Sequence, residues 1–308
     1  MGRIIEPLTS CGAKIKSNEY KAPLSIYGSS SVNPIEYNQD VASAQVKSCL
    51  ILSALYISGQ STFYEEIQTR DHTENLLEHL SYEINRDSNS LSLKGKQNLI
   101  AKDIFIGSDI SSAAFFIVAS LIVDGSCIEM RNVNINKLRT GIVTVLKGMG
   151  ADIEISDIKK VSNELLGNIR VRHSKLKCAD IRGEIIPSLI DELPILFIAC
   201  ACASGISKIS GIEELRYKES DRIMAMENGL RAIGINVHSS KDSIEITGGK
   251  ITGGKVNSYD DHRIAMSFAI AGLISKHSLT IKDTKNISTS FPTFVTILRE
   301  LGVEVFEV

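Results

Sequence analysis

Several features are scarce or absent in this 308-residue chain. It contains no tryptophan, and its six cysteines include no CxxC pair. Disulfide frameworks and zinc sites depend on such pairs, so both are disfavoured, and the cysteines are predicted to be small core residues in a reducing compartment. The net charge is −2. The chain therefore lacks the overall basic surface that is typical of nucleic-acid binders.

Long hydrophobic runs are also missing. The two longest, residues 113–123 and 193–203, are too short to span a bilayer, and we expect no signal peptide before the first predicted element. Hydrophobic residues make up 43% of the chain, which is enough for real cores, and a length of 308 residues favours two domains over one. We expect a soluble, cytoplasmic protein of two domains.

Two charged clusters dominate what is present. Residues 213–223 (EELRYKESDRI) and 259–266 (YDDHRIAM) each place cations beside carboxylates directly before an apolar helix. Arginine suits bidentate contact with carboxylate or phosphate, so two such clusters indicate a small, multiply anionic substrate. Either cluster alone is equally consistent with a solvated helix start that carries ordinary surface salt bridges.

A helix–turn–strand pattern recurs with a period of roughly 70 residues. Its four copies start near residues 45, 113, 193 and 265. Second helices follow, and the chain then turns at Gly150, Gly234 and Gly302 into predicted strands. Glycine suits these turns because a helix C-terminus commonly ends in a left-handed residue. Each unit is therefore a mixed helix–strand module.

The N-terminal segment breaks this pattern. Residues 3–15 have the form of the second half of a unit whose first half is absent. A half-unit leaves an apolar face without a partner, so we expect the chain to be an N-terminally truncated piece of a larger protein. An atypical capping half-repeat is the alternative.

Eight segments, in collinear order, resemble the 5-enolpyruvylshikimate-3-phosphate synthase family. They are residues 1–8, 43–48, 69–74, 107–114, 191–194, 215–223, 259–266 and 290–294. The resemblance implies a mixed α/β (α+β) fold, a two-domain inside-out α/β barrel of the enolpyruvyl transferase type, built from six helix–strand units. About four and a half units are present here, so the first one and a half, or roughly 110 residues, are missing.

The repeats indicate the domain boundaries, and the resemblance implies an active site in the cleft between the domains. Residues 1–106 would be the remainder of the N-terminal domain and residues 107–308 the second domain, with the active site in the interdomain cleft and a hinge near residues 107–109. Asp109 or Ser111 is predicted to cap the helix that follows.

The implied reaction transfers the enolpyruvyl group of phosphoenolpyruvate to the 5-hydroxyl of shikimate 3-phosphate and releases phosphate, a step of the shikimate pathway in aromatic amino-acid biosynthesis. It resembles an addition–elimination: the methylene carbon is protonated, the hydroxyl attacks C2, and the intermediate loses phosphate as the methyl is deprotonated. Such chemistry needs groups that move protons and cations at the anionic groups. No cofactor or metal is implied, and we expect a monomer with two small-molecule substrates and no nucleic-acid or membrane partner.

The resemblance assigns catalytic roles to Asp191, Lys218 and Glu219. Asp191 would act at the hydroxyl, although an aspartate before a helix is more often a cap. Glu219 would donate and retake the carbon-bound proton, with Lys218 beside it. Because Lys218 and Arg222 are four residues apart, a helix would place them on one face. Residues 260–262 (DDH) are expected to orient their segment, since no spaced partners support a metal site.

Binding residues are implied in the same way. Those for shikimate 3-phosphate are Ser43, Ala44, Gln45, Thr69, Asp191 and Lys218. Those for phosphoenolpyruvate are Gln45, Arg222 and Arg263. Small hydroxyls and backbone N–H groups at a helix start make an anion site. Arg70 and His72 either add charge or are simply solvated, and Thr289 stands where some members carry a lysine that contacts phosphoenolpyruvate.

Three alternatives stay open. One is the sibling enolpyruvyl transferase that acts on UDP-N-acetylglucosamine, which relies on different charged motifs. Another is a catalytically incomplete fragment, or half of a split protein, because a Lys-Ser pair and a phosphoenolpyruvate-binding glycine loop of the family precede the matching region. We accordingly expect the chain alone to have little activity. The third, an RNA-processing relative, is disfavoured by the net charge of −2 and the absence of aromatic-basic clusters.

Overall fold

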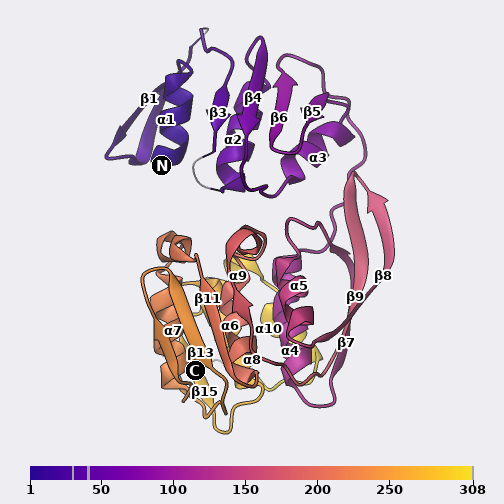
Figure 1. Cartoon of the computed structure of the whole chain (residues 1–308), viewed down its shortest axis with the longest axis vertical. Coiled ribbons are helices and arrows are strands. Elements are labelled where there is room, and N and C mark those ends of the chain that lie inside the picture. The colour runs from indigo at the N-terminus through magenta and orange to yellow at the C-terminus, as the bar shows by residue number, and fades with distance from the viewer. Residues whose placement is uncertain (30, 40–41, 307–308) are drawn as a thin grey trace. The chain divides into compact units, whose positions relative to one another are not determined.

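The chain divides into two compact units (Figure 1). The computed structural model describes residues 1–29, 31–39 and 42–306. The first unit is Met1–Ile106 with Lys160–Glu164, and the second is Gly107–Lys159 with Leu165–Val308, whose last two residues lie outside the described part. The domain bounds expected from the sequence place residues 160–164 in the second domain. They belong to the first unit because Asn163 hydrogen-bonds the carboxylate of Glu78 there.

The first unit is built around one four-stranded sheet. Its helices are α1 (Gly2–Ser10), α2 (Ala44–Ala54) and α3 (His72–His79), and its strands are β1 (Lys14–Asn18), β2 (Lys21–Tyr27), β3 (Glu36–Asn38), β4 (Gln60–Tyr64), β5 (Ile84–Arg86) and β6 (Ser90–Lys94). The sheet order is β3-β4-β6-β5, and β1 and β2 form a separate antiparallel pair. Strands β3 and β4 are parallel, so α2 is a crossover helix between them. Its residues Leu50 and Ile51 pack with Phe63 in the core.

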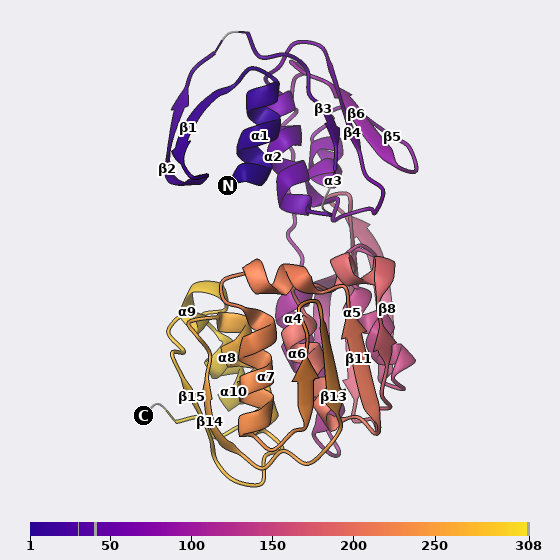
Figure 2. The same cartoon turned by 60° about the vertical axis from the view of Figure 1, so that its left-hand side comes forward.

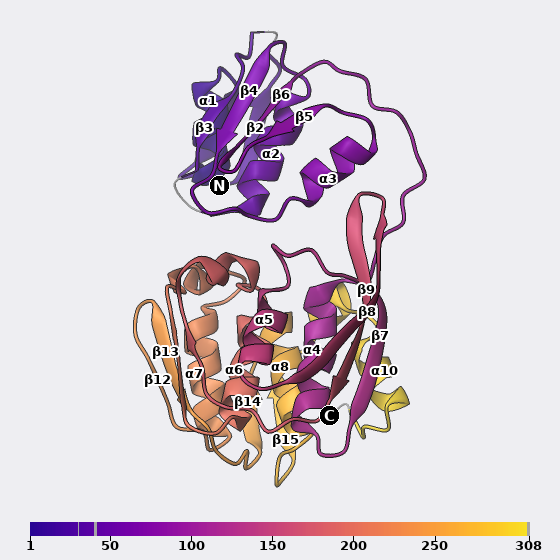
Figure 3. The same cartoon turned by 45° about the vertical axis from the view of Figure 1, so that its right-hand side comes forward.

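The second unit contains three further helix–strand groups, each with its own sheet. Its helices are α4 (Ile110–Ile122), α5 (Gly141–Gly148), α6 (Leu193–Cys202), α7 (Arg222–Ala232), α8 (His262–Gly272), α9 (Ile287–Ser290) and α10 (Phe294–Glu300), with 3₁₀ turns η1 (Gly183–Ser188) and η2 (Glu213–Tyr217). Its strands are β7 (Cys127–Asn134), β8 (Asp152–Val161), β9 (Glu164–Arg172), β10 (Asp180–Ile181), β11 (Ile206–Ser210), β12 (Val237–Ser239), β13 (Ser243–Thr247), β14 (Gly254–Asn257) and β15 (Leu279–Lys282). The sheets are β7-β9-β8, β10-β11-β13-β12 and β14-β15. Figure 3 shows β8 and β9 as a long hairpin.

Three helices form the centre of the second unit. Helices α4, α6 and α8 contact one another, and α4 and α6 are buried along almost their whole length. A helix that is apolar all round must be buried on all sides, which explains why these runs lie inside while the sheets lie outside. Helices α6 and α7 pack on the sheet of β10 to β13 (Figure 2). This arrangement confirms the predicted fold class.

The glycine turns of the repeat are present, with two departures. Gly150, Gly234 and Gly302 all adopt positive φ angles, as a left-handed helix end requires. After α3 the same place is taken by Ser81, with φ of 65°. The strand predicted after Gly302 is not formed, and residues 303–306 pair with no described strand. A strand needs a neighbouring edge to pair with, and periodicity alone does not reveal whether one is available.

The six cysteines are all free. Burial raises the pKa of the Cys200 and Cys202 thiols to about 12, which suits small core residues. Cys127 and Cys178, however, are exposed. The prediction of core cysteines is therefore wrong for these two, which lie in or beside strands at the unit's surface.

Candidate active site

Four helices of the second unit begin close to one another. A hydrogen bond from Ser111 of α4 to Glu192 links the starts of α4 and α6. Arg263 of α8 donates to the backbone oxygen of Asp191, just before α6, at 3.1 Å. Arg222 of α7 donates to Asp261, the residue before α8, at 2.8 Å. Helix N-termini carry positive potential and unpaired N–H groups, so this end of the unit favours anions.

Asp191 lies at the centre of this arrangement. Its carboxylate is 3.7 Å from the Lys218 ammonium and 3.9 Å from the Arg222 guanidinium, and its side chain is 16% exposed. Glu192 is the N-cap residue of α6, so Asp191 precedes the helix and does not cap it. The structure thus brings together four of the residues singled out in the sequence, namely Asp191, Lys218, Arg222 and Arg263.

Lys218 lies near Asp191, but not through the shared helical face that was predicted for it. It follows the 3₁₀ turn η2 and precedes α7, so it does not share a helical face with Arg222. The helix begins only at Arg222 because Asp221 caps it, accepting the Met224 N–H at 3.0 Å. Lys218 is held by Glu214 at 3.1 Å. Both cations still approach Asp191, because the turn folds Lys218 back toward it.

Arg222 and Asp261 form a buried ion pair. Their side chains are 1% and 0% exposed, and the Arg222 Nε–Asp261 Oδ2 distance is 2.8 Å. Burial by itself would raise the pKa of Asp261, but the hydrogen bond and charge of Arg222, the Arg263 N–H and the Ser220 hydroxyl lower it overall. The pair fixes the Arg222 guanidinium, so Asp261 orients that side chain, while the orienting role expected of Asp260 and His262 stays a prediction.

Glu219 is the most exposed of the three carboxylates around Arg222, which are those of Asp191, Glu219 and Asp261. Its side chain is 53% exposed, and Oε2 accepts a 2.5 Å hydrogen bond from Arg222 Nη2. A carboxylate that is held at one oxygen and open to solvent can exchange a proton with a bound ligand. This geometry is compatible with the predicted proton transfer at carbon.

His262 and Asp260 flank the buried pair. Burial, followed by the charge of Arg263, lowers the pKa of His262, and Asp260 is exposed. Within the described residues no cluster of three or more His, Cys, Asp or Glu side chains has the arrangement of a metal site.

Ser43, Ala44 and Gln45 form the start of α2 in the first unit. Ser43 is the N-cap residue, and its hydroxyl accepts the Val46 N–H at 3.5 Å, the outer limit of a hydrogen bond. Gln45 is exposed. The predicted anion site is therefore a helix start with a weakly engaged hydroxyl and an accessible amide.

Thr69 is buried, and its hydroxyl donates to Glu65 at 2.6 Å. Glu65 is itself bound by Lys47 at 2.9 Å, and Lys47 also contacts Glu74 at 2.8 Å. Burial raises the pKa of Glu74, although Lys47 opposes this effect. No role had been assigned to Lys47 from the sequence. A signal was present, because Lys47 occupies the first place in an apolar stripe with Leu50 and Ile51.

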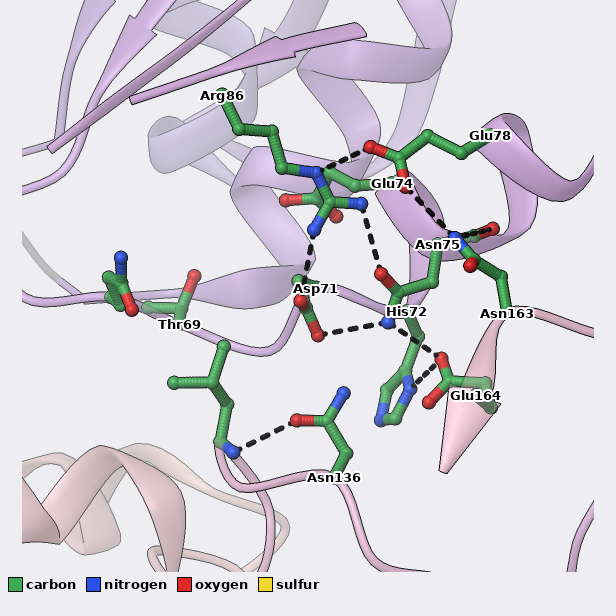
Figure 4. Close-up of polar contacts among 12 residues, drawn as sticks. Thr69, Asp71, His72, Glu74, Asn75, Glu78, Arg86, Asn136, Asn163 and Glu164 are labelled. Atoms are coloured by element: carbon green, nitrogen blue, oxygen red, sulfur yellow. Dashed lines mark hydrogen bonds and ion pairs between the residues drawn. The ribbon is translucent and has the colours of Figure 1, made fainter. Parts of the chain in front are cut away.

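His72 belongs to a polar cluster at the start of α3 (Figure 4). Its Nδ1 lies 2.7 Å from Glu164, and Glu164 also accepts from Asn75 at 3.2 Å. Arg86 contacts Asp71 at 3.1 Å in the same cluster. His72 is thus paired with a neighbouring carboxylate, and its expected contribution of charge to the site stays a prediction.

Comparison with known proteins identifies the family. The sequence profile of EPSP synthase (3-phosphoshikimate 1-carboxyvinyltransferase) matches residues 1–298. A 3-phosphoshikimate 1-carboxyvinyltransferase of Coxiella burnetii (strain CbuK_Q154) is 48% identical over 305 residues, which cover 99% of this chain and 70% of that relative. The chain belongs to the EPSP synthase family. A relative in Methylococcus capsulatus is 45% identical over 306 residues, covering 99% of this chain and 70% of the relative.

Solved structures agree with this membership. EPSP synthase from Acinetobacter baumannii superposes with a TM-score of 0.87 at 40% identity, covering 97% of this chain and 70% of that one. The enolpyruvyl transferase NikO from Streptomyces tendae shares the fold alone, with a TM-score of 0.78 at 13% identity, covering 98% of this chain and 71% of NikO. Among the described residues, no helix has the length and apolar character needed to cross a membrane.

Proposed function

We propose that this EPSP synthase family chain transfers the enolpyruvyl group of phosphoenolpyruvate to the 5-hydroxyl of shikimate 3-phosphate and releases phosphate. The observation that carries the proposal is the Asp191 carboxylate between Lys218, at 3.7 Å, and Arg222, at 3.9 Å. The two cations beside this carboxylate attract the anionic substrates, and a carboxylate oxygen within reach of the substrate hydroxyl can accept its proton.

Asp191 handles the hydroxyl proton in this proposal. Its backbone is anchored by Arg263 and its carboxylate is 16% exposed, so a ligand hydroxyl can reach it. Loss of that proton makes the oxygen a nucleophile toward C2 of phosphoenolpyruvate.

Glu219 and Lys218 handle the carbon-bound proton. The Glu219 carboxyl protonates the methylene carbon as the carbon–oxygen bond forms, and it takes a proton back as phosphate leaves. Its contact with Arg222 would be exchanged for a ligand contact during this step, and its 53% exposure leaves space for that movement.

Arg222 and Arg263 bind the carboxylate and phosphate of phosphoenolpyruvate in the proposal. Three carboxylates surround Arg222 in the structure, those of Asp191, Glu219 and Asp261. Release of Glu219 would free guanidinium N–H groups for the ligand, while Asp261 keeps the side chain in place.

Shikimate 3-phosphate is assigned to Ser43, Ala44, Gln45 and Thr69, together with Asp191 and Lys218. The start of α2 supports this, since Gln45 is exposed there. Thr69 is less well placed, because its hydroxyl proton is committed to Glu65. The two groups belong to different units, and the expectation that both contact one ligand stays a prediction.

The remaining assignments rest on composition and on the family. We propose a monomer in the cytoplasm with no nucleic-acid partner, in line with the net charge of −2.

Phosphate release from phosphoenolpyruvate in the presence of shikimate 3-phosphate tests the proposal. The chain is assayed alone and together with a polypeptide of that part of the Coxiella burnetii relative which it does not match. We expect low activity alone and a clear increase in the mixture. In the mixture, Asp191→Asn should reduce kcat by about 10²- to 10⁴-fold. The absence of phosphate release in both samples would contradict the proposal.

A further inference from the structure

Glu192 is a buried carboxylate that the proposed reaction does not use. It is the N-cap residue of α6, yet its side chain makes no capping hydrogen bond to that helix. The residue is 3% exposed, and burial raises the pKa of its carboxyl, against the opposing influence of Arg139, Arg263 and Ser111. A buried carboxylate is costly unless it is paired, so its partners matter.

Those partners lie at the start of α4. The Ser111 hydroxyl donates to Glu192 Oε1, and Arg139 Nη2 lies 3.8 Å from the same oxygen. This nitrogen of Arg139 also donates to Ser111, at 2.5 Å, and to Asp109, the cap of α4, at 3.2 Å. One guanidinium therefore holds the first turn of α4 and the N-cap of α6 together.

This tether acts on the residue next to Asp191. The Asp191 carbonyl is held by Arg263 of α8, and the Glu192 side chain is held by α4. The short segment before α6 is thus attached to a different central helix on each side. The Asp191 side chain extends from this segment toward Lys218 and Arg222, so its position depends on both attachments.

We propose that Glu192, with Arg139 and Ser111, is a positioning residue for Asp191. It touches no substrate, and it sets the carboxylate geometry that accepts the substrate hydroxyl. The proposal rests on the proposed function, since Asp191 is assigned there to shikimate 3-phosphate. A purely structural role, in which the cluster only joins α4 to α6, is the competing explanation.

A double-mutant cycle separates the two roles, with affinity for shikimate 3-phosphate as a readout that needs no turnover. Titration calorimetry on the full chain together with the complementary polypeptide compares the wild type, Glu192→Gln, Asp191→Ala and the double variant. Glu192→Gln keeps the shape and an acceptor for Ser111 but removes the charge beside Arg139. We expect it to weaken binding about tenfold through displacement of Asp191, and to have no further effect once Asp191 is alanine.

Glu227→Gln is the matched control. Glu227 lies on α7 and, like Glu192, is bound by an arginine and a serine, Arg231 and Ser239. Its change should leave the affinity within about twofold, because it lies outside the site. If Glu192→Gln does not fold, Ser111→Ala takes its place in the cycle, since it removes the hydroxyl that donates to Glu192 and leaves both charges.

The outcomes are distinct. A Glu192 effect that disappears in the Asp191→Ala background supports positioning. An effect of equal size in both backgrounds, or no effect at all, overturns it while leaving the proposed function intact. A wild-type chain that does not bind shikimate 3-phosphate even with the complementary polypeptide present contradicts the proposed function itself, and the positioning role then falls with it.

Discussion

Arg222 carries a full charge into the interior of the second unit, and Asp261 makes this possible. The two side chains are 1% and 0% exposed. Removing one partner of a buried pair leaves an uncompensated charge, which typically costs more than the pair contributes. The same contacts hold the guanidinium near Asp191, so stability and site geometry depend on one interaction.

Replacing Asp261 tests this dependence. Asp261→Asn should lower the free energy of unfolding by about 3–5 kcal/mol at pH 7. Because the folded-state pKa of Asp261 is lowered, its contribution is present above the unfolded pKa of about 3.9 and is lost as the pH falls through the folded pKa. The free energies of unfolding of the two proteins, measured with urea, should therefore begin to converge as the pH falls below about 4. Asp180→Asn, at an exposed pair with Arg182, is the control, and parallel pH profiles for wild type and Asp261→Asn would contradict the account.

His262 provides a second pH dependence. Its pKa is lowered chiefly by burial and then by Arg263, so the unfolded chain binds a proton before the folded one does. The contribution is present above the unfolded pKa of about 6.5 and is lost as the pH falls through the folded pKa. We expect the free energy of unfolding to fall between pH 7 and pH 5, and His262→Gln to reduce that fall. An unchanged profile for His262→Gln would refute this explanation.

At the scale of elements, helix ends determine where the functional side chains lie. Asp109, Asp221 and Asp261 cap α4, α7 and α8 through backbone N–H groups. Each cap fixes the first turn of its helix, and the first turns bear Ser111, Arg222 and Arg263. The C-terminal ends show the complementary rule, with glycine at the left-handed position after α5, α7 and α10.

Ser81 is the exception among these helix ends, and it leads to a prediction. With φ of 65°, the serine occupies a backbone region that disfavours residues with a Cβ atom. Ser81→Gly should raise the free energy of unfolding of the first unit by about 0.5–1 kcal/mol. The reverse change after α5, Gly150→Ala, should lower that of the second unit by about 1–2 kcal/mol, because φ is 94° there, although an added Cβ would meet the Lys175 carbonyl oxygen only at an ordinary contact distance of 3.8 Å. Chemical denaturation measures both, and destabilisation by Ser81→Gly would contradict the argument.

The buried cluster around Lys47 gives an element-scale prediction for α2. Lys47→Met leaves Glu65 and Glu74 buried without their cation. The free energy of unfolding of the first unit should fall by about 3–5 kcal/mol. Lys21→Ala, at an exposed pair with Glu19, should change it by less than about 0.5 kcal/mol. A similar loss of unfolding free energy in both variants would contradict a stabilising role for the buried cluster around Lys47.

At the scale of the whole molecule, the sequence predicted what depends on local pattern. The central helices follow from apolar runs such as residues 113–123, the glycine turns follow from backbone preference, and family motifs led to Asp191, Lys218 and Arg222. Partners distant in the chain were not predicted. The Lys47–Glu65 and Ser111–Glu192 contacts join residues 18 and 81 positions apart, and no periodicity encodes such pairs. Residues 160–164 were misassigned for the same reason, since only folded contacts place them in the first unit.

In the proposed reaction, Asp191 and Glu219 serve an addition–elimination at phosphoenolpyruvate. In that reaction the methylene carbon of phosphoenolpyruvate becomes a methyl group and then loses one hydrogen. Turnover in D₂O should therefore place deuterium in the product's methylene group, and Glu219→Gln should abolish both product and label while Glu227→Gln retains them. The measurement is mass spectrometry of the product formed by the chain together with the complementary polypeptide. A labelled product would confirm the account, whereas a product free of deuterium, or full turnover by Glu219→Gln, would contradict it.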